Sequence, residues 1–155
     1  MVFLQEVEKG SAEALARKSG MEKFRFAKDE GMHVGEYGVA TMSCLQLGAT
    51  QLYTLPETAQ GYNVILRTEA RVAESSLTLV DAFYSAGYDK EGRNGRLRAS
   101  WVVLDILERT EEPLILSDVP SSGQLGKGIR ASSQRPKYAF VHQSYAEVWV
   151  HGAIL

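Results

Sequence analysis

The stretch "YNVILRTEARVAESSLTLVDAFYSAG", residues 62–87, predicts a strand followed by a helix and so decides the fold class. Its first half alternates between two faces, as a half-buried β-strand does, with Arg67 and Arg71 on the charged face. Its second half, residues 75–87, has leucines and aromatics at helical spacings, a serine at its start and Gly87 at its end. This half therefore predicts a helix, with a strand as the lesser alternative.

Strand patterns continue on both sides of this stretch. Alternating or strand-forming segments are expected over residues 22–42, 43–55, 97–109, 114–119 and 137–155. The segment 97–109 also fits a helix, since Leu97, Trp101 and Leu104 would line up along one, but the run Trp101-Val102-Val103 favours a strand. Residues 10–20 predict a short helix with Ser11 as its N-cap.

These assignments give about seven extended segments, two helices and no alternation of strand with helix. The sequence predicts one α+β domain over residues 1–155, mainly antiparallel β (a sandwich or partly closed barrel), with a short N-terminal helix and one internal helix. Within it, residues 1–20 would form an N-terminal arm and helix, and residues 120–137 a long flexible basic loop.

Composition narrows the class of protein. The chain has 155 residues and a net charge of −2, from 17 basic and 19 acidic residues, so the whole molecule does not act as an electrostatic binder of nucleic acid or membrane. Cys44 is its single cysteine, which excludes an internal disulfide. Charges interrupt every apolar run, so neither a signal peptide nor a membrane span is expected, and the location is expected to be cytoplasmic or in a virion-like particle assembled there.

Motifs for catalysis are incomplete. In "SSGQLGKG", residues 121–128, a serine stands where a phosphate-binding loop needs its first glycine, and Gly128 stands where it needs a hydroxyl. His142-Gln-Ser144 has the H-x-S form of two-histidine phosphodiesterases, but no second copy accompanies it. Cys44 lies in an apolar run, as a buried thiol does. We therefore expect no catalytic residues, no metal ligands and no cofactor.

A partial signature suggests a ligand. The run Arg67-Thr-Glu-Ala-Arg71 resembles the first half of the signature of PilZ domains, which are small β-barrels that bind cyclic dinucleotides. Residues 118–123 match the second half only in part, because Pro120 stands in place of a serine. The resemblance implies that Arg67 and Arg71 bind an anionic ligand.

The long polar segment 120–137 carries basic residues and no acidic one, and loops of that length are usually functional or disordered. Its length, with exposed aromatics elsewhere, favours a non-enzymatic, self-assembling structural subunit of a ring or tube, such as a phage tail or neck component, whose partners are its own copies and other assembly subunits. The alternatives are a ligand- or nucleic-acid-binding regulatory module and an enzyme of unrecognised type. The expected binding residues are Lys127, Arg130, Arg135, Lys137, Arg67 and Arg71.

Overall fold

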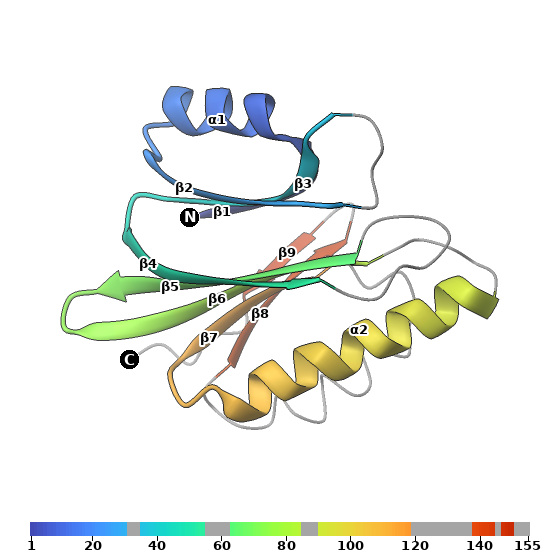
Figure 1. Cartoon of the computed structure of the whole chain (residues 1–155). Coiled ribbons are helices and arrows are strands. Elements are labelled where there is room, and N and C mark those ends of the chain that lie inside the picture. Colours follow the sequence, from blue (N-terminus) through green and yellow to red (C-terminus); the bar gives the residue numbers. More distant parts are fainter. Residues whose placement is uncertain (31–34, 55–62, 85–89, 119–137, 145–146, 151–155) are drawn as a thin grey trace.

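The computed structural model describes residues 1–30, 35–54, 63–84, 90–118, 138–144 and 147–150. These residues form four layers, in which two open β-sheets stack face to face and one helix covers the outer face of each sheet (Figure 1). The prediction of a mainly antiparallel α+β fold with two helices is confirmed. The alternative of a partly closed barrel is wrong, because the strands divide between two separate sheets.

The first sheet has three antiparallel strands in the order β1-β3-β2, which are Val2–Glu8, Tyr37–Ser43 and Lys23–Lys28. The helix α1, Lys9–Lys18, packs on its outer face through Ala12 and Ala16, whose small side chains are buried. The helix predicted at 10–20 is therefore confirmed. Its N-cap, however, is Glu8 rather than Ser11, and the expected arm is strand β1.

The second sheet has six strands in the order β4-β5-β6-β7-β8-β9. The strands are Gln46–Thr54, Asn63–Val72, Ser75–Tyr84, Leu114–Asp118, Tyr138–Ser144 and Glu147–Val150. The pairs β6-β7 and β7-β8 are parallel, and the other pairs are antiparallel. Residues 137–155, predicted as one long strand or two short ones, contain the two short strands β8 and β9.

The predicted helix at 75–87 is wrong, because residues 75–84 form strand β6. Both faces of this strand are covered. Leu79 packs between the two sheets, whereas Val80 and Ala82 pack under α2. A strand that is buried on both faces loses its polar alternation and reads as a continuous apolar run, which imitates helical spacing.

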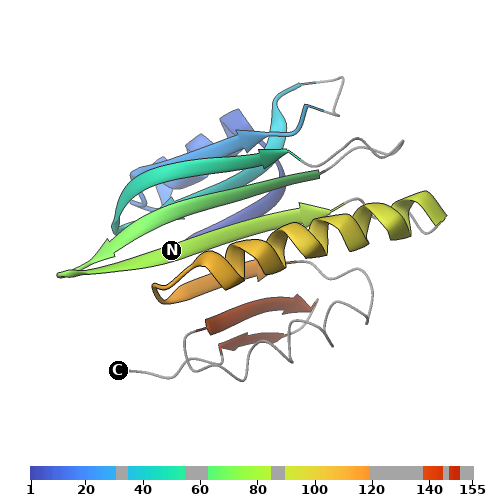
Figure 2. The same ribbon diagram turned by 60° about the horizontal axis from the view of Figure 1, so that its bottom comes forward.

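The predicted strand at 97–109 is also wrong, because this segment belongs to the helix α2, Lys90–Arg109. Ala99, Val103 and Leu107 recur every four residues and are buried against the second sheet, so tertiary packing outweighs the strand preference of the Trp-Val-Val run. Since β6 and β7 are parallel and α2 connects them, the chain contains the strand-helix-strand unit that was not expected from the sequence (Figure 2).

The core lies in two places. Between the sheets, Ala27 and Val39 from the first sheet meet Leu66 and Phe83 from the second. Under α2, a second cluster joins the helix to the outer face of β5, β6 and β7. At the side of the sandwich, Arg25 of β2 donates hydrogen bonds of 3.2 Å each to the Leu47 carbonyl oxygen and the Thr50 hydroxyl of β4. Both sheets are thus fixed relative to each other.

The hairpin between β5 and β6 turns through Ala73 and Glu74, and Ala73 has a φ of 54°. A left-handed conformation costs an L-residue about 1–2 kcal/mol, whereas glycine adopts it without a steric penalty. We expect Ala73→Gly to raise the free energy of unfolding by about 1 kcal/mol. Urea denaturation would measure it, with exposed Ala49→Gly in β4 as the control that should destabilise.

Candidate functional site

The carboxyl ends of five strands meet along one edge of the sandwich. Phe3 of β1 packs near Leu79 of β6, and two residues later Gln5 reaches Asp81, so β1 runs in the same direction as β6. β2 is parallel to β1, since both pair antiparallel with β3, and β7 and β8 are parallel to β6. In open α/β sheets, ligands bind beyond the carboxyl ends of the strands, so this edge is the first place to look for a site.

A polar bridge joins the two sheets near this edge. The Nε2 of Gln5 donates a hydrogen bond of 3.1 Å to Oδ1 of Asp81 and another of 3.1 Å to the carbonyl oxygen of Ala82. Asp81 has 0% of its surface exposed. A buried carboxyl group is costly unless it is hydrogen-bonded, so Gln5 compensates for the burial of Asp81 and fixes its orientation.

Glu6, the residue after Gln5, has an unusual backbone. Its φ is 50°, and the pairing of β1 with β3 shifts register between Leu4 and Val7. The bulge contains Glu6, whose side chain is exposed and which follows Gln5 directly in the sequence. A left-handed conformation at a residue other than glycine costs free energy and persists only where the surrounding structure imposes it, and such residues cluster at functional sites.

Further polar residues take register positions at the same edge. Ala82, which accepts the Gln5 hydrogen bond, pairs with Asp118 of β7, and Asp118 pairs with His142 of β8. In the first sheet, buried Asp29 follows β2, and its backbone N–H donates to the Tyr37 carbonyl oxygen at 2.8 Å. Four of the five converging strands, β1, β2, β6 and β7, therefore have an acidic residue at or close to their carboxyl ends.

The described side chains do not assemble a metal site. Among them, no three His, Cys, Asp or Glu side chains come together as ligands for a metal ion. Within the same residues, neither α1 nor α2 has the length and apolar character of a membrane-spanning helix.

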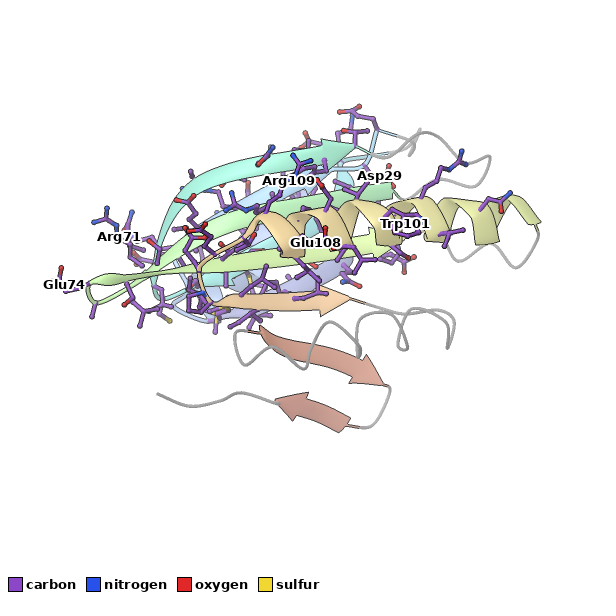
Figure 3. All side chains as sticks on the ribbon, turned by 90° about the horizontal axis from the view of Figure 1, so that it is seen from below. Asp29, Arg71, Glu74, Trp101, Glu108 and Arg109 are labelled. Atoms are coloured by element: carbon purple, nitrogen blue, oxygen red, sulfur yellow. The ribbon has the colours of Figure 1, made fainter. Side chains whose placement is uncertain are left out.

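The binding residues predicted from the sequence lie elsewhere. Arg67 is 22% exposed, with its Nη1 3.9 Å from Oε1 of Glu69, and Arg71 lies near the β5-β6 hairpin, at the opposite end of the molecule from Asp29 (Figure 3). The structure does not bring these arginines to the carboxyl-end edge. The other four predicted residues, Lys127, Arg130, Arg135 and Lys137, lie outside the described residues.

Sequence reasoning did not identify Gln5 or Glu6, and it noted Asp81 as unusual without assigning it to a site. Asp81 carried a usable signal, because a single carboxyl within the apolar run "LTLVDAFY" is expensive to bury. Because that run was assigned to a helix, Asp81 was attributed to a polar face or to a salt bridge with an arginine of residues 93–98. Gln5 carried none, since its partner lies 76 residues away in the sequence.

The fold has known counterparts. No protein-family profile matches the sequence, and no curated protein matches it. Solved structures of tyrosyl-DNA phosphodiesterase 2 (TDP2) are similar: D. rerio TDP2 in complex with a single-stranded DNA product has a TM-score of 0.55 and 19% sequence identity over 74% of this chain. Truncated Caenorhabditis elegans TDP2 has a TM-score of 0.53 and 13% identity over 89% of this chain. The chain spans less than half of these proteins, 44% and 45% of their lengths.

These similarities correct three expectations. The prediction of a non-enzymatic, self-assembling structural subunit is wrong, because solved structures that share this fold include those of TDP2, a phosphodiesterase. The preference for a protein without enzymatic activity and the expectation of a virion or assembly component are overturned by the same finding. The PilZ resemblance is not supported either, because PilZ domains are barrels and the two sheets here are open. The chain has a fold that it shares with TDP2.

Proposed function

We propose that the chain is the core of an enzyme that hydrolyses phosphodiester bonds in nucleic acid. The observation that carries the proposal is the polar bridge between Gln5 and buried Asp81, beside Glu6 with its left-handed backbone, at the edge where the strands of both sheets end. The similarity of the fold to TDP2, seen in one structure with a single-stranded DNA product, supports the same reaction class.

Each of the three residues has a distinct role in this proposal. Glu6 is the exposed carboxylate, so it is placed to accept a proton from a water molecule that attacks the phosphorus. The bond from phosphorus to the leaving oxygen breaks, and solvent protonates that oxygen. Gln5 and Asp81 are positioning residues, because they are held between the sheets and fix the backbone on which Glu6 stands.

The basic residues named from the sequence remain proposed contacts for the phosphates of the substrate. Lys127, Arg130, Arg135 and Lys137 follow β7, whose carboxyl end Asp118 lies at the candidate edge. A local group of four positive charges suits a polyanion on a chain whose net charge is −2. Arg67 and Arg71 are proposed contacts for more distant phosphates, since Arg71 lies at the other end of the sheet.

The proposal is tested by assaying the purified chain on bis(p-nitrophenyl) phosphate and on a single-stranded oligonucleotide, with magnesium added and with a chelator. The chain is expected to hydrolyse at least one of them faster than buffer. We expect Glu6→Gln to lower kcat about 100-fold, because a positioned general base contributes at least this factor.

Glu74→Gln is the matched control, because Glu74 is an exposed carboxylate at the β5-β6 hairpin, away from the candidate edge (Figure 3). It should hydrolyse both substrates at the rate of the unmodified chain. Absence of hydrolysis under every condition would refute the proposed function. Equal rates for Glu6→Gln and Glu74→Gln would refute the assignment of Glu6.

A further inference from the structure

The outer surface of α2 carries two large apolar side chains that the fold leaves in solvent. Trp101 is 65% exposed and Leu97, one helical turn before it, is 57% exposed. The core of the protein does not need them, because α2 packs on the sheet through its opposite side, with Ala99, Val103, Ile106 and Leu107. Residues four apart on a helix are neighbours, so Leu97 and Trp101 form one apolar ridge.

The charge along α2 is uneven. Residues 90–98 contain four basic residues, Lys90, Arg93, Arg96 and Arg98, and one acidic residue, Glu91. Arg98 is exposed beside the ridge and has no ion pair among the described residues. In the second half of the helix, Arg109 is neutralised by Asp105, with 2.8 Å between Nη2 and Oδ1. The ridge therefore adjoins a locally positive segment on a protein whose net charge is negative.

The positive half of α2 lies on the side of the candidate site. β6 ends at the carboxyl-end edge with Tyr84, and five residues separate it from the first residue of α2. Five connecting residues span about 20 Å at most, so the first turn of the helix lies within that distance of the end of β6. Leu97 and Trp101 follow about 10 and 16 Å further along the helix axis.

We propose that the ridge of Leu97 and Trp101 is a binding platform for single-stranded nucleic acid, on which an unpaired base stacks while the basic half of α2 attracts the backbone phosphates. This inference deepens the proposed function and rests on it for the location of the reaction. Exposed aromatic rings next to positive charge are the elements by which proteins hold single strands. Bases in a duplex already stack on one another, so a Trp on a convex helix favours the single strand.

The experiment is an equilibrium titration of a fluorescein-labelled 20-mer of deoxythymidine, followed by fluorescence anisotropy at low salt. Stacking on one aromatic side chain is worth enough that we expect Trp101→Ala to weaken binding about tenfold, whereas Trp101→Phe keeps most of the affinity. The matched control is Leu15→Ala on α1, where Leu15 is a large exposed apolar residue on the opposite outer layer. It should bind as the unmodified chain does.

A second probe isolates the base. A 20-mer of abasic sites has the same phosphates and no bases, so Trp101→Ala should bind it with the same affinity as the unmodified chain does. Arg98→Glu should weaken binding of both probes and lower the dependence of affinity on salt concentration, whereas Arg17→Glu on α1 should change neither. Arg98 thus reports the phosphate contact and Trp101 the base contact.

Three results would overturn the inference: equal affinities for Trp101→Ala and Leu15→Ala, a loss of abasic binding in Trp101→Ala as large as the loss with bases, or a duplex bound as tightly as the single strand. The second result would mean that Trp101→Ala disturbs the fold rather than a base contact. The third would mean that the surface binds only the phosphate backbone. Binding needs no turnover, so it can be present when hydrolysis is absent, and the failure of this inference is distinct from a failure of the proposed function.

Discussion

Replacing Gly38 with alanine is expected to destabilise the chain by about 3 kcal/mol or more, which removes much of the stability of an ordinary domain. Gly38 lies in β3, the central strand of the first sheet, opposite Lys28 of β2 and Val7 of β1. A Cβ at this position would fall far inside van der Waals contact of the Ala27 carbonyl oxygen and 2.9 Å from its carbonyl carbon. The obstacle is backbone, which cannot turn away as a side chain can.

Separation of β2 from β3 would also disturb the hydrophobic core between the two sheets. Val39 follows Gly38 directly and packs between the sheets with Ala27. The loss should therefore appear as a lower midpoint in urea or heat denaturation, or as insoluble protein. Gly48→Ala in β4 is the control, because its Cβ would meet nothing nearer than Glu69 Cβ at 3.5 Å. That variant should keep or slightly raise the stability, and a similar loss in both variants would contradict the steric explanation.

Removing the polar bridge is the second large change. We expect Gln5→Ala to lower the free energy of unfolding by about 3 kcal/mol, because the buried Asp81 carboxyl loses a donor and a cavity opens between the sheets. Gln51→Ala, at an exposed position of β4, should cost less than about 0.5 kcal/mol. Both are measured by chemical denaturation of the full chain.

A double-mutant cycle tests the cause. If the hydrogen bond to Asp81 accounts for the loss, Gln5→Ala should cost less in a chain that already carries Asp81→Ala than in the unmodified chain. Strictly additive losses would show that Gln5 acts through packing alone. The cycle is informative because the two side chains touch directly, at 3.1 Å.

The part of the fold that the sequence predicted is the part set by local pattern. The alternation through Lys23–Lys28 and Asn63–Val72 identified β2 and β5, and the helix α1 was predicted over residues 10–20. In β2 and β5, charged residues recur at every second position, and in α1 the buried Ala12 and Ala16 are four residues apart, so the period of each element is visible in the sequence. For these elements, hydrophobic periodicity alone was enough to predict the secondary structure.

The two wrong assignments share a physical cause. β6 is covered on both faces, so its polar face is missing, and α2 contains strand formers at Trp101, Val102 and Val103, of which only Val103 is fully buried. In both elements, contacts with segments distant in the sequence decided the structure. The same two errors hid the parallel pairing of β6 with β7. That pairing requires a strand, a helix and a strand in that order, and the sequence predicted a helix followed by two strands.

The candidate site could not be predicted from local sequence patterns, for a related reason. Its two bridging residues come from different sheets, and no spacing in the sequence connects Gln5 with Asp81. The left-handed backbone of Glu6 arises from a β-bulge against β3, and a glutamate in a strand-like run gives no sign of it. The sequence could show that Asp81 was unusual, but the reason lay in the packing.

The hydrogen bond between Gln5 and Asp81 closes a chain loop of 76 residues. Contacts of such long sequence separation form late in folding, because the entropy of loop closure must be overcome before they stabilise anything. β-hairpins and helix turns form within microseconds, well before two sheets can dock. Formation of the contact between Gln5 and Asp81 after dilution from denaturant is therefore expected to mark the step at which the two sheets meet.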